Sequence, residues 1–398
     1  AALDLDGFLG EQLGDLYGQF QERLRERGLD PADYVFLPVH PWQWREQTVA
    51  TMHQDFHSGA LVLLGESADD YLPQQSIRTL SNASRPERAY LKCALSIVNT
   101  STSRILAPHT VLNAPVISDW LAGIAADDPF LRDELRVIVL REIAGLAYDR
   151  PQPALLITLT YGTASCIWRE SLHGFLDDGE QAAPWNGLTQ RHQDGRPLID
   201  PWVRRHGLEA WLKPALELSI LPIIHLLYAH GVALESHAQN MVLIHRDGLP
   251  QRVAFKDFHD GVRFMPEHLA APERQPRLHA TPARHWGVNR NSYVTATSPE
   301  DVRDFVLDAF LFINLAELAL FLADEYGLSE RRFWGMASAI IDGYQQRFPQ
   351  LRERFDLFDL RTPTIQVERL TNRRLFPETD VQVHRVGNPL AIIREHHA

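Results

Sequence analysis

The chain has few cysteines and no long unbroken apolar run. These two features argue against a disulfide-bonded or cysteine-metal protein and against a membrane-spanning one. Its 398 residues include only two cysteines, Cys93 and Cys166, which lie in apolar segments without a CxxC partner. Isolated thiols of this kind are typical of a buried core in a reducing compartment, rather than of disulfides or metal sites. Crossing a bilayer requires about 20 consecutive apolar residues, and we see no such run. The sequence therefore predicts a cytoplasmic protein without a membrane-spanning segment.

Positive charge is also scarce. Lysine and arginine number 39 against 51 aspartates and glutamates, which gives a net charge of -12 at pH 7. Broad nucleic-acid binding requires a basic face, so we exclude nucleic acid as a partner. An anionic small molecule stays compatible with this composition where cations are concentrated locally.

Apolar periodicity indicates mixed secondary structure in the first half of the chain. A helix is expected over residues 111–125. Strands are expected at residues 34–39, 60–64, 90–98, 137–146 and 163–169. In the strand at 90–98, alternation puts Lys92 on the face opposite the core.

Helices dominate the second half. The polar stretch 177–201 reads as a long loop between the halves, and a helix over 208–230 follows it. Capping signals at Ser298 and Ser329 predict two further helices. We therefore expect an α+β fold with two domains, at residues 1–168 and 169–398.

The densest polar cluster is Glu235-Ser236-His237-Ala238-Gln239-Asn240, which precedes an apolar hairpin that ends in Lys256-Asp257-Phe258. Acids, an imidazole and amides beside a buried hairpin favour a site for a metal-bound nucleotide. The alternative is a set of cap and turn residues that satisfy their own backbone. That alternative explains Ser236 or Asn240, but it does not explain Glu235, His237, Gln239 and Asp257 together.

Two weaker clusters lie in the first half. Ser76-Ile77-Arg78-Thr79 can offer a hydroxyl and a guanidinium to phosphate oxygens, although a surface arginine beside a turn is the simpler interpretation. Lys92, with Thr100, Ser101 and Arg104 after it, makes a cationic patch rich in hydrogen-bond donors. A solvated loop is the alternative there. The GxxxxGK[ST] spacing of a P-loop is absent.

The order of the polar residues in the cluster 235–240 and at Asp257 favours adenylation over phosphoryl transfer. Kinase-like folds place an Asn and an Asp on Mg2+ beside the nucleotide phosphates. A phosphotransferase also needs an Asp as base in the first loop, where His237 and Gln239 stand here. Attack of a carboxylate on the α-phosphate of ATP needs no strong base in its first step, so we expect that chemistry.

With these clusters in chain order, the sequence resembles the NRPS-independent siderophore synthetases of the IucA/IucC type. The matching marks are His40-Pro41-Trp42-Gln43, Ser76-x-Arg78-Thr79, Lys92 within residues 91–97, Thr100-Ser101-x-x-Arg104, Glu235-x-His237-x-Gln239-Asn240, Lys256-Asp257-Phe258 and Asn388-Pro389-Leu390. The resemblance extends over nearly the whole chain. Family members often carry Asn where Ser101 stands.

The resemblance implies a hand-like fold with ATP between a mixed fingers domain and a kinase-like palm, whose helices pack on an antiparallel sheet. The N-terminal thumb of the family is expected to be absent from this chain. Contacts to the phosphates and the acyl group are implied for the fingers residues Ser76, Arg78, Thr79, Lys92, Thr100, Ser101 and Arg104. From the palm, His237 stabilises the α-phosphate, Gln239 and Asn240 hold the nucleotide, and Glu235 and Asp257 position Mg2+. His237, Arg104 and Lys92 are the implied catalytic groups.

The implied reaction joins a carboxylate such as citrate to an amine, hydroxylamine or alcohol, with ATP and Mg2+ as cofactors. A kinase-like small-molecule phosphotransferase and a nucleotide-binding fragment without acyl activation are the alternatives. The sequence leaves the carboxylate, the nucleophile and the oligomeric state open, with a homodimer among the options.

Two further histidines, His225 and His230, lie near the end of the predicted helix over 208–230. No acid or cysteine follows them at the spacing that metal ligands require. We therefore interpret them as packing or capping groups.

Overall fold

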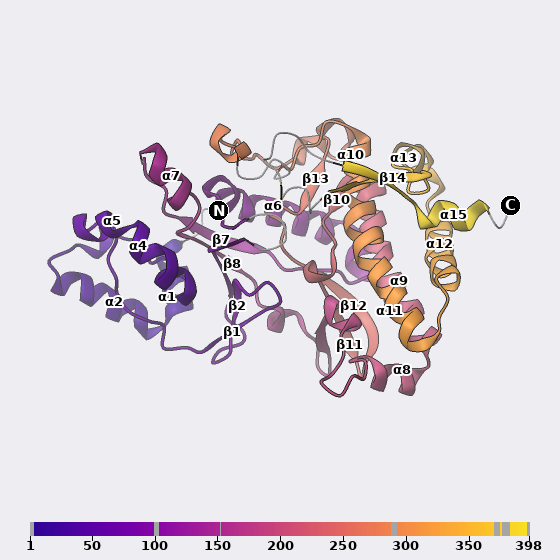
Figure 1. Cartoon of the computed structure of the whole chain (residues 1–398), viewed down its shortest axis with the longest axis horizontal. Coiled ribbons are helices and arrows are strands. Elements are labelled where there is room, and N and C mark those ends of the chain that lie inside the picture. The colour runs from indigo at the N-terminus through magenta and orange to yellow at the C-terminus, as the bar shows by residue number, and fades with distance from the viewer. Residues whose placement is uncertain are drawn as a thin grey trace. The chain divides into compact units, whose positions relative to one another are not determined.

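The computed structural model describes residues 4–98, 103–151, 153–287, 293–369, 375 and 383–395. The chain divides into two compact units. Unit 1 consists of Ala1–Val116, Arg141–Phe175 and Leu278–Val288, and unit 2 consists of Ile117–Leu140, Leu176–Arg277 and Asn289–Ala398. Both units mix helices with sheets whose strand pairs are antiparallel except for the parallel pair β6–β12 in unit 2, which confirms the predicted α+β class (Figure 1). The predicted domain boundary after residue 168 stays a prediction.

Unit 1 is built on a five-stranded antiparallel sheet in the order β1-β2-β3-β8-β7. Its strands are β1 (Tyr71–Pro73), β2 (Thr79–Asn82), β3 (Tyr90–Cys93), β8 (Ser165–Arg169) and β7 (Glu142–Ala147). A small hairpin of β4 (Leu95–Val98) and β5 (Ser103–Arg104) follows β3 in the chain.

Short helices make up most of the rest of unit 1. They are α1 (Leu5–Leu13), α2 (Asp15–Glu26), α3 (Pro41–Gln43), α4 (Val49–Thr51), α5 (His53–Ser58) and α7 (Ala154–Thr160). The helix α6 (Pro108–Asp127), which contains the predicted helix 111–125, begins in unit 1 and ends in unit 2.

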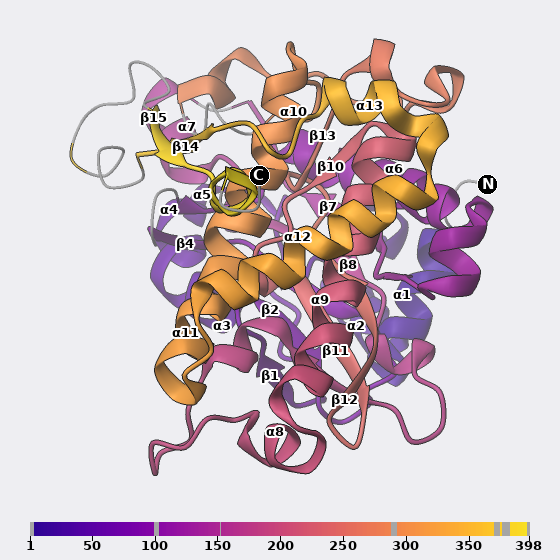
Figure 2. The ribbon, with the colours of Figure 1, turned by 90° about the vertical axis from the view of Figure 1, so that its right-hand side faces the viewer.

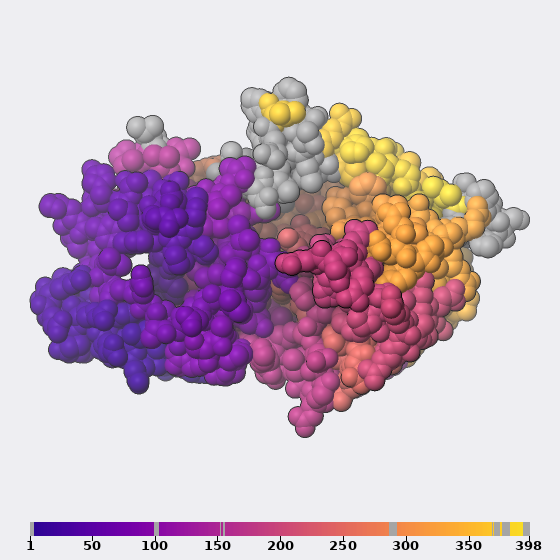
Figure 3. Space-filling model, turned by 60° about the horizontal axis from the view of Figure 1, so that its bottom comes forward, coloured from indigo at the N-terminus to yellow at the C-terminus, as the bar shows by residue number. Residues whose placement is uncertain are grey.

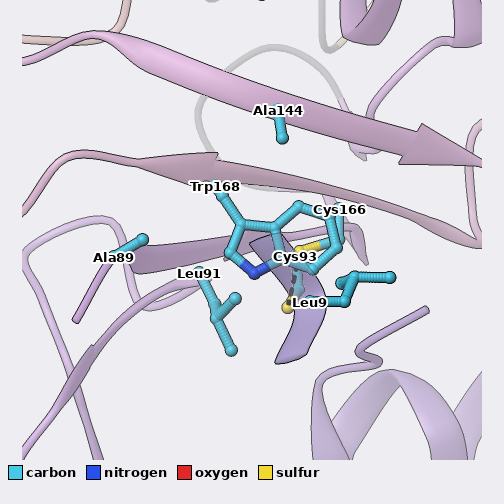
Figure 4. Close-up of a cluster of buried hydrophobic side chains, with 7 residues drawn as sticks. All are labelled: Leu9, Ala89, Leu91, Cys93, Ala144, Cys166 and Trp168. Carbon is cyan, nitrogen blue, oxygen red and sulfur yellow. Dashed lines mark hydrogen bonds between the residues drawn. The ribbon is translucent and has the colours of Figure 1, made fainter. Parts of the chain in front are cut away.

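Trp168 of β8 is central to the core of unit 1. Its indole is 2% exposed and packs with Leu9 of α1 and with Cys93 and Cys166, as Figure 4 shows. Burying one such ring removes 150–250 Å² from water, so this single side chain contributes a large share of the attraction between α1 and the sheet.

The predicted strand at 90–98 is broken at Ala94. Leu91 and Cys93 share the core face, as alternation predicted, but Lys92 on the other face is also only 3% exposed. The Ala94 N–H donates to Ser165 at 2.9 Å, after which the chain leaves this sheet and pairs with β5. The strands predicted at 34–39 and 60–64 were wrong, because neither segment enters a ladder among the described residues.

Unit 2 contains a four-stranded sheet in the order β6-β12-β11-β9. The strands are β6 (Ile138–Val139), β12 (Leu249–Phe255), β11 (Met241–Arg246) and β9 (Gln181–Pro184). The predicted hairpin is β11–β12, and its turn places Asp247 and Gly248 at positive φ of 50° and 84°, as a tight hairpin requires. β9 lies inside the stretch predicted to be a loop, and its pairing with β11 corrects that prediction. The predicted strand 137–146 is likewise split, into β6 and β7.

Helices cover this sheet. They are α8 (Asp200–His206), α9 (Leu208–His225), α10 (Pro299–Val306), α11 (Ala316–Tyr326), α12 (Glu330–Arg347), α13 (Arg352–Leu357) and α15 (Pro389–Glu395). α9 contacts β12 on one side and α12 on the other, and α12 lies in front of α9 in Figure 2. α15 packs on α12, where yellow atoms meet orange ones in Figure 3. Two short ladders complete the unit: β10 (Val232–Leu234) with β13 (Val262–Phe264), and β14 (Thr364–Glu368) with β15 (Val383–Gly387).

Two stretches of unit 2 are long and apolar enough to cross a membrane by length and composition alone, namely Leu208–His230 and Pro299–Tyr326. Their most apolar windows are 67% and 61% buried inside the protein. Core helices of globular proteins have the same character, so these helices are weak evidence for a membrane segment.

Candidate functional site

In unit 2 the two polar segments predicted to bind a ligand lie together. The loop 235–240 joins β10 to β11, and residues 256–261 join β12 to β13. Backbone hydrogen bonds tie the loops at both ends, because Glu235 donates to Gly261 at 2.8 Å and Lys256 donates to Asn240 at 3.0 Å. The two antiparallel ladders therefore hold the acid, imidazole and amide groups at one end.

Gly261 leaves room for the backbone of Asp257 on one side and for the side chain of Glu235 on the other. A Cβ at this position would lie 2.4 Å from the carbonyl oxygen of Asp257 and 3.5 Å from the Cβ of Glu235. Only glycine fits so close to backbone. Asp257 itself has a positive φ of 70°, a conformation that costs energy for a residue with a side chain and is common at functional sites.

A backbone hydrogen bond in this loop defines which ring nitrogen of His237 carries the proton. Its Nδ1 accepts the backbone N–H of Gln239 at 3.3 Å, so the neutral ring carries its proton on Nε2. That Nε2 lies 3.9 Å from Oε2 of Glu235, which is too far for a hydrogen bond. The side chain is 28% exposed and therefore presents an N–H donor that an oxyanion can use.

Two buried amides hold the loop in shape. The side chain of Asn240 donates to the carbonyl oxygen of Glu235 at 2.9 Å. Asn314 donates to the carbonyl oxygen of Ser236 at 2.8 Å. Asn314 comes from the π-helical segment η11 (Leu307–Leu315), far along the sequence, and was not predicted as a site residue. The available signal was a lone Asn within the apolar stretch 309–315. Gln239, by contrast, is exposed.

In unit 1 three of the predicted phosphate-binding residues, Ser76, Arg78 and Thr79, lie at the turn between β1 and β2. Ile77 has a positive φ of 45°, and the hydroxyl of Ser76 donates to that of Thr79 at 2.8 Å. Thr79 stands directly opposite Lys92 in the β2–β3 ladder. Lys92 is almost fully buried, although lysines are seldom buried unless their charge is compensated.

Arg78 connects this turn to Arg104. Its Nη1 donates to the carbonyl oxygens of Arg104 and Ile105 at 2.8 and 3.0 Å. The Arg78 carbonyl oxygen accepts the N–H of Cys93 at 2.9 Å. Arg78, in the turn before β2, thus contacts the backbone at Arg104 of β5 and pairs with the backbone of β3, the strand that carries Lys92. Thr100 and Ser101 lie outside the described residues.

The segment His40-Pro41-Trp42-Gln43 supports the same region. Gln43 is fully buried; its Oε1 accepts the N–H of Ser96 at 2.7 Å, and its Nε2 donates to the carbonyl oxygen of Thr163 at 3.0 Å. This side chain therefore positions β4, from which the chain leads to Arg104. Burial lowers the pKa of His40, and a hydrogen bond with the backbone of Ile77 opposes that shift.

Two family profiles match the chain. Residues 4–190 match the IucA / IucC family, and residues 209–382 match the profile described as ferric iron reductase FhuF-like transporter.

Curated relatives match along most of the chain. The citryl-spermidine/3,4-dihydroxybenzoyl-citryl-spermidine:spermidine ligase of Bacillus anthracis is 43% identical over 94% of this chain and 61% of that protein. The aerobactin synthase of Escherichia coli is 33% identical over 88% of this chain and 59% of that protein. The chain thus spans about three-fifths of the length of these relatives.

Solved structures agree with these matches. The petrobactin biosynthesis protein AsbB from Bacillus anthracis superposes with a TM-score of 0.91 at 41% identity, over 99% of this chain and 65% of that one. The ATP-bound aerobactin synthetase IucA of Klebsiella pneumoniae shares the fold, with a TM-score of 0.64 at 18% identity over 96% of this chain and 66% of that one.

Proposed function

The chain belongs to the IucA/IucC family of NRPS-independent siderophore synthetases, and from this membership we propose that it is an ATP-dependent ligase of siderophore assembly. The observation that carries the proposal is the arrangement in unit 2, where backbone hydrogen bonds join the loop of Glu235 and His237 to the loop of Asp257. In this proposal unit 1 corresponds to the fingers of the family and unit 2 to its kinase-like palm, and the enzyme acts in the cytoplasm.

The reaction has two steps. A carboxylate oxygen of the donor attacks the α-phosphorus of ATP, the bond to the β-phosphate oxygen breaks, and pyrophosphate leaves. An amine then attacks the acyl carbon of the adenylate, AMP leaves with the electron pair of the broken C–O bond, and the amine loses a proton as the amide forms. Hydroxylamines and alcohols follow the same path.

The palm loop supports the first step. The Nε2–H of His237 is directed away from its own backbone contact, and such a donor stabilises charge that develops on the α-phosphate. Gln239 and Asn240 hold the nucleotide, with Asn240 also bracing the loop through Glu235. Carboxylates are the protein ligands that Mg2+ prefers, so Glu235 and Asp257, on the two loops that meet at Gly261, are the proposed ligands of this ion. When bound, Mg2+ neutralises charge on the phosphates.

Cations of unit 1 support the same step. Ser76, Arg78, Thr79, Lys92, Thr100, Ser101 and Arg104 are the proposed contacts to the phosphates and the acyl group. Arg78 donates a hydrogen bond to the backbone carbonyl of Arg104, which ties β5 to the turn that carries Ser76 and Thr79. Lys92 and Arg104 are the proposed catalytic cations, because a fixed positive charge stabilises the negative charge that develops on the phosphates in the transition state.

The names of the relatives indicate which classes of carboxylate and amine to consider as substrates. The Bacillus anthracis relative is named for citryl-spermidine and spermidine, a citryl amide and a polyamine. We therefore propose that this chain activates a carboxylate of citrate or of a citrate monoamide and joins it to a primary amine. Since the chain covers about three-fifths of that relative, activity must be measured on the chain itself.

The test is product analysis with ATP, Mg2+, citrate and a panel of diamines. AMP and pyrophosphate in equal amounts, together with a citryl amide in the mass spectrum, support the proposal. ADP in place of AMP would instead establish a phosphotransferase. Nucleotide binding without pyrophosphate release for any donor would show a fragment that has lost acyl activation, and either result would overturn the assignment.

A further inference from the structure

We propose that Asp128, His225 and His230 of unit 2 form a binding site for a divalent transition-metal ion, with Zn2+ as the ion that suits the donors best. This site shares no residue with the proposed nucleotide loop and does not depend on the proposed function. From the sequence, both histidines were expected to be packing or capping groups, because no acid or cysteine follows them at the spacing that metal ligands require. The structure supplies the acid from 97 residues upstream of His225.

The three donor atoms face one another. Oδ2 of Asp128 lies 2.9 Å from Nε2 of His225 and 2.9 Å from Nε2 of His230, and all three ligand atoms lie within 4.8 Å of one another. Tetrahedral Zn2+ holds N and O ligands at about 2.0–2.2 Å, which separates them from each other by about 3.4 Å. A small outward movement of each group is therefore enough to admit the ion.

Local structure explains why these side chains converge. His225 ends α9, and His230 ends the π-helical segment η6 (Leu226–His230). The wider π-helical turn brings residues five positions apart onto one face, and such turns are frequent at functional sites. The two imidazole rings lie 5.6 Å apart, centroid to centroid.

Asp128 is oriented by the backbone. Its Oδ1 accepts the N–H groups of Phe130 and Leu131 at 2.9 and 3.0 Å, which fixes the plane of the carboxylate and directs Oδ2 at the two imidazoles. Two histidines and one carboxylate are a common protein ligand set of catalytic zinc sites. Mg2+, by contrast, prefers oxygen donors alone.

A supporting contact on His225 completes the geometry. Its Nδ1 lies 2.8 Å from the hydroxyl of Tyr344 on α12. Metal-binding histidines usually hydrogen-bond through their other ring nitrogen, which fixes the tautomer and the ring orientation. With a metal on Nε2, Nδ1 carries the proton and donates it to the Tyr344 oxygen.

An ion can reach the cluster from a cavity of about 250 Å³ in unit 2. Asp128 and His230 belong to its wall, together with Trp120, Pro129, Leu269 and Arg274. The side chains of His230 and Asp128 are 21% and 15% exposed, whereas that of His225 is 5% exposed. The cavity leaves room for a water molecule as fourth ligand, which three protein ligands at a zinc ion require.

The test uses the full chain, freed of metal with EDTA and titrated with Zn2+ in competition with a chromogenic chelator. We expect one equivalent to bind at micromolar concentration or below. Co2+ in its place is expected to give the strong visible absorption of a four-coordinate ion. His230→Gln and Asp128→Asn are expected to weaken binding by about 100-fold or more, because each removes one of three protein ligands.

Two variants separate metal binding from a structural role. Tyr344→Phe removes only the supporting hydroxyl and is expected to weaken Zn2+ about 10–100-fold. His206→Gln is the matched control, because His206 bonds only a surface carbonyl oxygen, that of Asp247, at 2.9 Å, and should leave the affinity unchanged. If no equivalent binds, or if all variants bind alike, the three residues are a hydrogen-bonded cluster and the proposal is wrong. Circular dichroism of each variant confirms folding.

Discussion

The side-chain amide of Asn314 donates a hydrogen bond to the carbonyl oxygen of Ser236 at 2.8 Å, and the same nitrogen lies 3.2 Å from Sδ of Met241. One buried side chain on a helix therefore fixes both ends of the loop that carries His237. The shape of this loop depends on a residue that cannot itself be identified from the loop sequence.

Replacing Asn314 by Ala should lower both stability and activity. The buried carbonyl of Ser236 loses its partner, which costs about 1–3 kcal/mol, and a shifted His237 is expected to reduce pyrophosphate release roughly 10–100-fold. Asn388→Ala is the matched control, because Asn388 is 1% exposed and donates to the carbonyl oxygens of Leu360 and Thr362. That variant should lose stability and keep its rate per folded molecule. Equal rates for both variants would contradict a positioning role for Asn314.

His237→Ala and Arg104→Ala should each lower turnover by about two orders of magnitude or more, because both groups are proposed to stabilise charge in the transition state. The measurement is pyrophosphate release at saturating ATP and citrate. Thermal melting of both variants should stay near that of the parent, since neither side chain is fully buried. Unchanged rates would remove both residues from the site.

Gly261→Ala should disturb the magnesium site specifically. The new methyl group would meet the Asp257 carbonyl oxygen at 2.4 Å, so the backbone of Asp257 must move. We expect the Mg2+ concentration for half-maximal activity to rise at least about tenfold, since carboxylate ligands work only in the correct geometry. Gly343→Ala on α12 meets nothing within 4 Å and is expected to stabilise the helix by about 0.5–1 kcal/mol. An unaltered Mg2+ dependence in Gly261→Ala would argue against Asp257 as a ligand.

Acid sensitivity offers a test of the Asp128 cluster without metal. The pKa of Asp128 lies at about 2, below the usual 3.8, because hydrogen bonds outweigh its burial. A lowered folded-state pKa adds stability that is present above pH 4 and is lost as the pH falls toward 2. Urea unfolding in EDTA should therefore show a shallower loss of stability between pH 4 and 2 in Asp128→Asn than in the parent. Parallel curves over that window would contradict this contact.

The two cysteine thiols should not react with alkylating reagents in the folded protein. Their sulfur atoms lie 4.0 Å apart and both are 2% exposed or less. Burial raises the pKa of Cys166, and the neighbouring Cys93 raises it further, so the reactive thiolate is scarce. Labelling with iodoacetamide, followed by mass spectrometry, should give no adduct until denaturant is added, when both thiols react. Rapid labelling of the native protein would show that the core of unit 1 opens easily.

Local signals in the sequence predicted local structure well. The hydroxyl of Ser298 caps α10 by accepting the N–H of Asp301, and that of Ser329 caps α12 through Arg332. Both contacts span three residues, so composition and spacing suffice to predict them. The hairpin β11–β12 follows for the same reason.

Long-range pairing was not predictable from one sequence. β9 is a strand only because Ala182 and Ala183 meet Ile244 and Leu243 about sixty residues later. Asp128 likewise meets His225 across 97 residues. In the loop 235–240 the residue types indicated a ligand site, but the bracing by Asn314 required the fold.

β9 also influences what happens when the protein unfolds in part. It is a short edge strand that ends in Pro184, and proline cannot donate a ladder hydrogen bond to an arriving strand. Beside it in the sheet, β11 carries the apolar run Met241-Val242-Leu243-Ile244, and an exposed apolar strand edge can recruit other chains. Local detachment of β9, a strand of four residues, would uncover that edge.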